Sequence, residues 1–197
     1  MASNAPLTGW MEEVRARLEA RSRAEAARVP EGLPRAGVLV PLFVRDGKLW
    51  VLLTRRAESV EHHPGQISFP GGAEEDGDED LSATALRETE EELGIAPADV
   101  IPLGSLSPIV TVTNFYVEPF VAAAPQPYVW RPAEAEIAEV IEAPLATLMD
   151  PAILEARPRP DGDGTILFYH FGEHVIWGAT AKILAELLEA LRLQPVT

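Results

Sequence analysis

The middle of the chain consists of apolar runs whose length and spacing are typical of β-strands. Residues 36–56 contain two such runs separated by Asp46 and Gly47, a pair that favours the tight turn of a hairpin. The Pro- and Gly-interrupted stretch HHPGQISFPGG, residues 62–72, predicts a loop with a short strand at its centre. Further strands are expected in residues 113–124, 137–141 and 165–178, the last segment turning at Gly172 and Glu173.

Two residues within these strands suggest where their strands lie. Pro119 has no N–H to give to a neighbouring strand, and it therefore indicates an edge strand or a bulge. Trp177, in the apolar run IWG, is expected to be a core residue.

Apolar residues recur at helical spacing near both ends of the chain and in one acidic segment. Helices are therefore expected at residues 8–28, 80–93 and 179–194, with a short one from Pro144. Gly94 follows the acidic helix, where a left-handed C-cap is common. Strands in the middle, covered by these helices, predict one α/β domain with a mixed sheet at residues 34–197, and residues 1–33 as an N-terminal helix and linker packing on it.

Composition narrows the function classes. The 197 residues are 47% hydrophobic, contain no cysteine and carry a formal net charge of -15. The negative charge argues against nucleic acid and anionic membranes as partners, because both require a basic surface. The chain has neither a membrane-spanning apolar run nor the apolar region of a signal peptide, so we expect a cytoplasmic protein whose partner is a small molecule.

The acidic residues are concentrated in one place. Ten of the nineteen residues from Glu74 to Glu92 are Asp or Glu. On a helix, Glu88, Glu91 and Glu92 share one face, and like charges at these spacings destabilise a helix by roughly 0.2 to 0.5 kcal/mol per pair. This segment alone is compatible with a solvated acidic face and with a site for a hard divalent cation such as Mg²⁺ or Mn²⁺.

A calcium-binding loop of the EF-hand type is excluded. Asp76, Asp78 and Asp80 have the right alternation, but Leu81 replaces the required glycine. Arg87 stands where such a loop needs its last glutamate.

The glycine pair Gly71–Gly72 and the run from Arg87 to Ile95 resemble the Nudix hydrolase signature, G-x5-E-x7-R-E-U-x-E-E-x-G-U, where U is apolar. Thr89 departs from it at an apolar position, and the loop is one residue longer. The first glutamate of the signature therefore corresponds to Asp78 when counted from Gly72, and to Glu79 when counted from Arg87.

Segments on both sides of the signature resemble the coenzyme A pyrophosphatase branch of this superfamily. They are LLTRRA and HHPGQISFPGG before it, and NFYVEPFV, EIAEVIEAPLATLMDP and HVIWGATAKIL after it, and the similarity extends over roughly residues 35–184. Glu61 stands where the branch generally has a basic residue, which would weaken a contact to the phosphates of the substrate.

The resemblance implies a fold, a cofactor and a set of roles. It implies a Nudix-type α/β/α sandwich with a mixed sheet, and Mg²⁺ or Mn²⁺ bound by Glu88, Glu91, Glu92 and a backbone carbonyl of Gly71 or Gly72. Arg87 would orient Glu91. The general base would in the first place be Glu88, with Glu136 and Glu139 from a later loop as the other candidates. Arg55, Arg56 and Gln66 would bind substrate, although ordinary structural roles explain these three equally well.

The implied activity is hydrolysis of the pyrophosphate bond of coenzyme A and its derivatives, giving 3',5'-ADP and 4'-phosphopantetheine or its acylated form. One alternative is a Nudix hydrolase of another nucleoside diphosphate derivative, such as ADP-ribose or NADH. A third hypothesis is a Nudix-fold sensor of nucleotide or metal without catalysis, which the intact acidic set disfavours.

Overall fold

The computed structural model describes residues 8–20, 32–61, 63–160, 162 and 164–192. The expected hairpin is confirmed, because β1 (Arg35–Arg45) and β2 (Lys48–Arg56) pair antiparallel with Arg45 opposite Lys48. Both residues of its turn have positive φ. The short strand expected in the Pro- and Gly-interrupted loop is β3 (Ile67–Ser68), and β4 (Gly71–Ala73) follows it.

The main sheet has eight strands and is mixed, as expected. Its central order is β3-β2-β1-β7-β5, and β4 pairs with β1, β6 with β7 and β8 with β2. Among the strand pairs in the described part of the chain, only β1–β7 is parallel. The remaining strands are β5 (Ile101–Ser105), β6 (Ile109–Val110), β7 (Tyr116–Ala123) and β8 (Ile137–Pro144).

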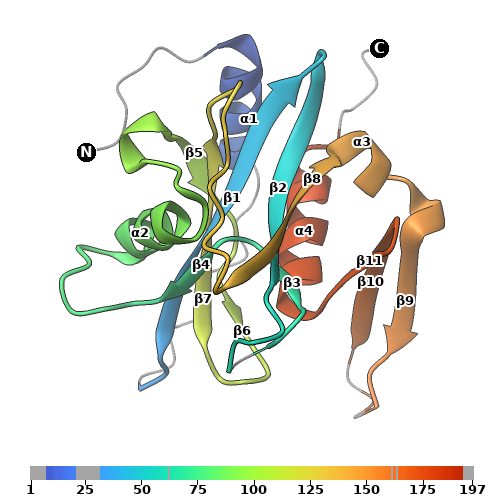
Figure 1. Ribbon diagram of the computed structural model, residues 1–197. Helices are drawn as coiled ribbons and strands as arrows, with labels where there is room; N and C mark the ends of the chain where they lie inside the picture. The colour runs from blue at the N-terminus through green and yellow to red at the C-terminus, as the bar shows by residue number, and fades with distance from the viewer. Residues whose placement is uncertain (1–7, 21–31, 62, 161, 163, 193–197) are drawn as a thin grey trace.

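Helices cover both faces of this sheet, which confirms the α/β/α sandwich (Figure 1). The acidic helix α2 (Leu81–Leu93) packs on Leu39, Phe43 and Leu52. The alternate residues of the same strands point to the other face, where they meet α1 and α4 in the larger core cluster. The remaining helices are α1 (Gly9–Ala20), α3 (Leu145–Leu148) and α4 (Gly178–Ala190), with 3₁₀ turns at Pro97–Asp99 and Pro151–Ile153.

A second, three-stranded sheet beside the main one was not expected from the sequence. It is antiparallel, in the order β11-β10-β9, and consists of β9 (Leu154–Pro158), β10 (Thr165–Phe171) and β11 (His174–Trp177). The expected turn at Gly172 and Glu173 is confirmed. The expectation that Trp177 is a core residue is wrong, because it is 46% exposed and stacks on Phe168 on an open face of this sheet.

The expectation for Pro119 is also wrong. Its strand, β7, lies inside the sheet between β1 and β5, and the bulge on this side is in β5 between Pro102 and Gly104. Pro119 is tolerated because it lies between the residues of β7 that pair with β5 and those that pair with β6. Its carbonyl oxygen accepts a hydrogen bond from the N–H of Leu106 at 2.9 Å.

The N-terminal helix packs on the core through Val14 and Leu18, both buried. Its expected continuation to Arg28 lies outside the described residues. The C-terminal helix ends at Ala190, before the expected residue 194, and residues 193 and 194 lie outside the described residues. None of the helices in the described part of the chain is long and apolar enough to cross a membrane.

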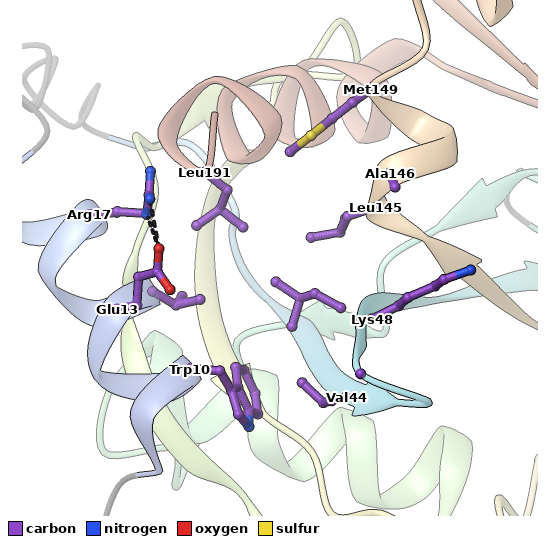
Figure 2. A pocket seen from close by; sticks show the side chains of 12 residues that line it. Trp10, Glu13, Arg17, Val44, Lys48, Leu145, Ala146, Met149 and Leu191 are labelled. Carbon is purple, nitrogen blue, oxygen red and sulfur yellow. Dashed lines mark hydrogen bonds and ion pairs between the residues drawn. The ribbon is translucent and has the colours of Figure 1, made fainter. Parts of the chain in front are cut away.

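A cavity of about 360 Å³ separates α1 from the tip of the β1–β2 hairpin and from α3 (Figure 2). Trp10, Val44, Leu145 and Met149 are among the mainly apolar residues that line it. The cavity adjoins Lys48 at the start of β2, whereas Arg56 at the other end of the strand lies beside the acidic helix.

We predict that Gly37→Ala destabilises the fold by roughly 3 kcal/mol, because the added methyl group overlaps the backbone of α2. A Cβ at position 37 would strike the carbonyl oxygen of Leu81 and come within 3.1 Å of the N–H nitrogen of Ala85. Urea unfolding measures the change. Gly9→Ala is the control, because a Cβ there has nothing within 4 Å and should change the free energy of unfolding by less than about 0.5 kcal/mol. Equal stability of both variants would contradict the close packing of α2 on β1.

Candidate active site

Local signals fix both ends of the acidic helix. The side chain of Asp80 caps its N-terminus by accepting hydrogen bonds from the N–H groups of Ser82 and Ala83 at 2.8 and 2.9 Å. Gly94 ends the helix with φ of 68°, which confirms the expected left-handed C-cap. Thr89, which replaces an apolar residue of the signature, is fully buried and its hydroxyl donates to the carbonyl of Ala85, so it leaves no polar group unpaired.

The helix lies unusually close to the glycine-rich strand β4. A Cβ at Gly72 would overlap the carboxylate of Glu88, and a Cβ at Gly71, whose φ is 148°, would overlap the backbone of Gly37 and Val38. Only glycine leaves this space open. Gly37 belongs to the same contact and was not among the predicted site residues, although a glycine inside an apolar strand is a recognisable sign of close backbone approach.

Asp78 is the acidic residue of the preceding loop that lies at the site, and its carboxylate binds Arg87. Nε and Nη2 of Arg87 donate to the two carboxylate oxygens of Asp78 at 3.1 and 3.2 Å. These bonds, with one from the backbone N–H of Glu75, hold the pKa of Asp78 well below its usual range. Glu79, the other candidate for the first glutamate of the signature, is exposed.

The third guanidinium nitrogen of Arg87 reaches the helix carboxylates. Nη1 donates to Glu88 at 2.9 Å and to Glu91 at 3.3 Å, so the expected contact between Arg87 and Glu91 is present. The side chain of Glu91 is 61% exposed, whereas that of Glu88 is 18% exposed. Burial raises the pKa of Glu88 although the hydrogen bond from Arg87 lowers it, and repulsion from Glu91 and Glu136 raises it further.

Glu92 is the most buried of the helix carboxylates, with 4% of its side chain exposed. One oxygen accepts a hydrogen bond from the N–H of Gly71 at 3.3 Å, and the other lies 3.9 Å from Nη1 of Arg56. Burial raises the pKa of Glu92 to about 8. The hydrogen bond from Gly71 and the attraction of Arg56 lower this pKa, but by less than burial raises it. The negative charge of this group is therefore poorly compensated.

The remaining candidates separate onto two faces of the sheet. Arg56 points toward Glu92, and Glu136 acts on both Glu88 and Glu92 by repulsion. Arg55 instead pairs with Glu139 at 2.9 Å, and Glu139 also lies 3.4 Å from Nε2 of His174. Arg55 alternates with Leu53, and Glu139 with Ile141, both of which belong to the larger core cluster. Arg55 and Glu139 therefore lie on the face away from α2.

Gln66 meets β2 through its backbone. Its carbonyl oxygen accepts a hydrogen bond from the N–H of Arg56 at 3.0 Å, which holds the β2–β3 loop beside the site.

The acidic site suits a hard divalent cation by its chemistry. Its side chains offer carboxylate oxygens, two of these carboxylates have raised pKa values, and the missing side chain of Gly72 lets the carboxylate of Glu88 lie against the backbone of β4. Within the described residues, however, no three His, Cys, Asp or Glu side chains form a ready-made metal cluster. Arg87 and the N–H of Gly71 hold the carboxylates instead, so binding would require them to turn.

Comparison with known proteins identifies the family. A model of the NUDIX domain matches residues 33–161. The chain belongs to the Nudix family. Two proteins named uncharacterized Nudix hydrolase NudL, from Salmonella paratyphi B and Salmonella newport, are each 39% identical to it over 166 residues, which cover 81% of this chain and 84% of theirs. The protein is therefore a Nudix hydrolase.

Solved structures agree on the fold. A MutT/nudix family protein from Enterococcus faecalis superimposes with a TM-score of 0.56, covering 92% of this chain and 74% of that one at 18% identity. At this identity the likeness supports the α/β fold and no particular substrate.

We predict that Glu92→Gln stabilises the metal-free protein at alkaline pH by roughly 2 kcal/mol. The pKa of Glu92 is raised from 4.5 to about 8 on folding. Its contribution to stability is therefore fully present below pH 4.5 and is lost as pH rises through 8. Unfolding by urea in a chelator at pH 5 and pH 9 measures this. Glu90→Gln, an exposed position on the same helix, should leave the difference between the two pH values unchanged. A lower stability of Glu92→Gln at pH 9 would contradict the burial of an uncompensated charge.

Proposed function

We propose that this Nudix hydrolase cleaves the pyrophosphate bond of coenzyme A and its derivatives, giving 3',5'-ADP and 4'-phosphopantetheine or its acylated form. The observation that carries the proposal is the pair of carboxylates, Glu88 and Glu92, drawn out of water against the backbone of Gly71 and Gly72. The negative charge of such a site repels a diphosphate unless cations lie between them. An enzyme that cleaves a diphosphate with the help of divalent cations needs carboxylates in this arrangement to bind those cations.

Mg²⁺ or Mn²⁺ is the proposed cofactor, and it would supply the positive charge that stabilises the diphosphate during its hydrolysis. Glu88, Glu91, Glu92 and a backbone carbonyl of Gly71 or Gly72 are the proposed ligands. Arg87 orients Glu88 and Glu91 through Nη1, and Asp78 holds Arg87 in place through two hydrogen bonds.

Coenzyme A is favoured as the substrate by the resemblance of the segments around β2 and β3. Two hydrogen bonds join these segments, from the N–H of Arg56 to the carbonyl of Gln66 and from the hydroxyl of Thr54 to the carbonyl of Ser68 at 3.3 Å. They form one wall beside Glu92, where Arg56 is suitably placed for a phosphate. Their contact supports the proposal that the segments around β2 and β3 belong to one substrate site.

Glu136 is the proposed general base. It is exposed, and it acts electrostatically on both Glu88 and Glu92, so water near the scissile bond would lie within its reach. Glu88 already accepts a hydrogen bond from Arg87, and Glu139 is paired with Arg55 on the other face. Within the described residues the side chain of Glu136 has no such ion pair, and a carboxylate of this kind is better suited to receive a proton.

The substrate is tested by incubating the protein and Mg²⁺ with coenzyme A, ADP-ribose or NADH and separating the products. We expect 3',5'-ADP from coenzyme A at the highest kcat/KM. Glu92→Gln should lower the rate by roughly 1,000-fold through loss of a metal ligand, and Glu90→Gln should not change it. Faster cleavage of ADP-ribose or NADH would overturn the assignment of coenzyme A, and full activity of Glu92→Gln would overturn the site.

The position of the base is tested by comparing two glutamates of the same segment. Glu136→Gln should lower kcat by roughly 100-fold or more with little change in KM, because a general base acts on the chemical step. Glu139→Gln should stay within about threefold of the wild type, because its partners are Arg55 and His174. Equal losses in both variants would show that neither residue has the proposed role.

A further inference from the structure

The segment that links β7 to β8 binds the C-terminal end of the acidic helix (Figure 1). We call residues 128–133 of this segment the strap. The hydroxyl of Tyr128 donates to the carbonyl of Gly94 at 2.8 Å and accepts from the N–H of Ala96 at 3.4 Å. The N–H of Arg131 donates to the carbonyl of Leu93 at 2.8 Å. Carbonyls at the end of a helix have no partner within the helix, so the strap supplies what water would otherwise supply.

One residue of the strap connects the backbones of Glu92 and Glu136. The N–H of Ala133 donates to the carbonyl of Glu92 at 2.9 Å, and the carbonyl of Ala133 accepts from the N–H groups of Glu136 and Ile137, each at 2.8 Å. The carbonyl of Glu136 in turn accepts from the N–H of Ala57 at 2.7 Å. A displacement of the strap therefore moves Glu136 relative to Glu92.

The strap is also fixed on the side away from the helix. Nε1 of Trp130 donates to Glu142 at 2.8 Å, and Glu142 forms an ion pair with Arg45 at 2.7 Å. The rings of Tyr128 and Trp130 pack with their centroids 5.2 Å apart, and Trp130 packs on Phe43 in the core beneath α2. Tyr128 thus joins a rigid part of the sheet to the end of the helix.

We propose that Tyr128 is a positioning residue for hydrolysis, holding the strap so that Glu136 faces Glu88 and Glu92. This inference rests on the proposed function, and specifically on the role of Glu136 as base. Tyr128 is too far along the chain to be read as part of the signature, and it acts through hydrogen bonds to the helix end. A tyrosine that merely capped the helix would contribute to stability without affecting the chemical step.

Tyr128→Phe tests the proposal, because it removes the hydroxyl and keeps the ring against Trp130. Tyr169→Phe is the matched control, since it removes the hydroxyl of a buried tyrosine in the larger core cluster. Hydrogen exchange of the amides of Arg131 and Ala133 is measured without substrate, and kcat and KM are measured with coenzyme A and Mg²⁺.

In Tyr128→Phe we expect exchange at both amides to accelerate about tenfold and kcat to fall about five- to tenfold, with KM within twofold and Tyr169→Phe unchanged in all three. Unchanged exchange would overturn the role of Tyr128 in holding the strap. Faster exchange with unchanged kcat would overturn its role in positioning. If the wild type cleaves none of the three substrates, the proposed function fails, and Glu136 has no hydrolytic step for which Tyr128 could position it.

Discussion

The close approach of α2 to β1 and β4 is the constraint on which the site depends. It exists because Gly37 presents no side chain where the backbone of the helix lies, and Gly72 presents none where the carboxylate of Glu88 lies. Gly71 lets β4 lie directly against the backbone of β1. The close approach of α2 brings Glu92 into the interior, with one oxygen on the N–H of Gly71 and 4% of its side chain exposed. A glutamate in such a place costs stability when it is ionised, so its presence indicates a task other than holding the fold.

The charges around Glu92 are distributed unevenly. Arg87 is largely occupied by Asp78, which takes two of its hydrogen bonds, and Nη1 is shared between Glu88 and Glu91. Arg56 lies 3.9 Å from Glu92, which is beyond hydrogen-bond distance. The site is thus acidic and only partly neutralised, which suits a divalent cation followed by an anionic substrate. The family relationship and this electrostatic imbalance lead independently to the same kind of chemistry.

Local signals in the sequence predicted the helices, strands and turns well. The sequence did not predict contacts between residues that are far apart in the chain. The Asp46–Gly47 turn and the C-cap at Gly94 each depend on a few neighbouring residues, and both were confirmed. The wrong expectations, at Pro119 and Trp177, depended on how strands pair and which face a second sheet leaves open. The strap was missed for the same reason, since no local pattern shows that Tyr128 reaches Gly94. Alternation along β2 predicts that Arg55 and Arg56 point to opposite faces of the sheet. Deciding which of them points to the site requires knowing which face α2 covers.

We propose that Glu88 and Glu92 are held together, largely out of water, in order to bind a divalent cation. A crystal structure of the wild type soaked in Mn²⁺, with data collected at the manganese absorption edge, tests it most directly. We expect an anomalous peak in contact with carboxylate oxygens of both Glu88 and Glu92, beside the backbone of Gly71 and Gly72. Absence of a peak there, with Glu88 still on Arg87 and Glu92 still on the N–H of Gly71, would contradict it.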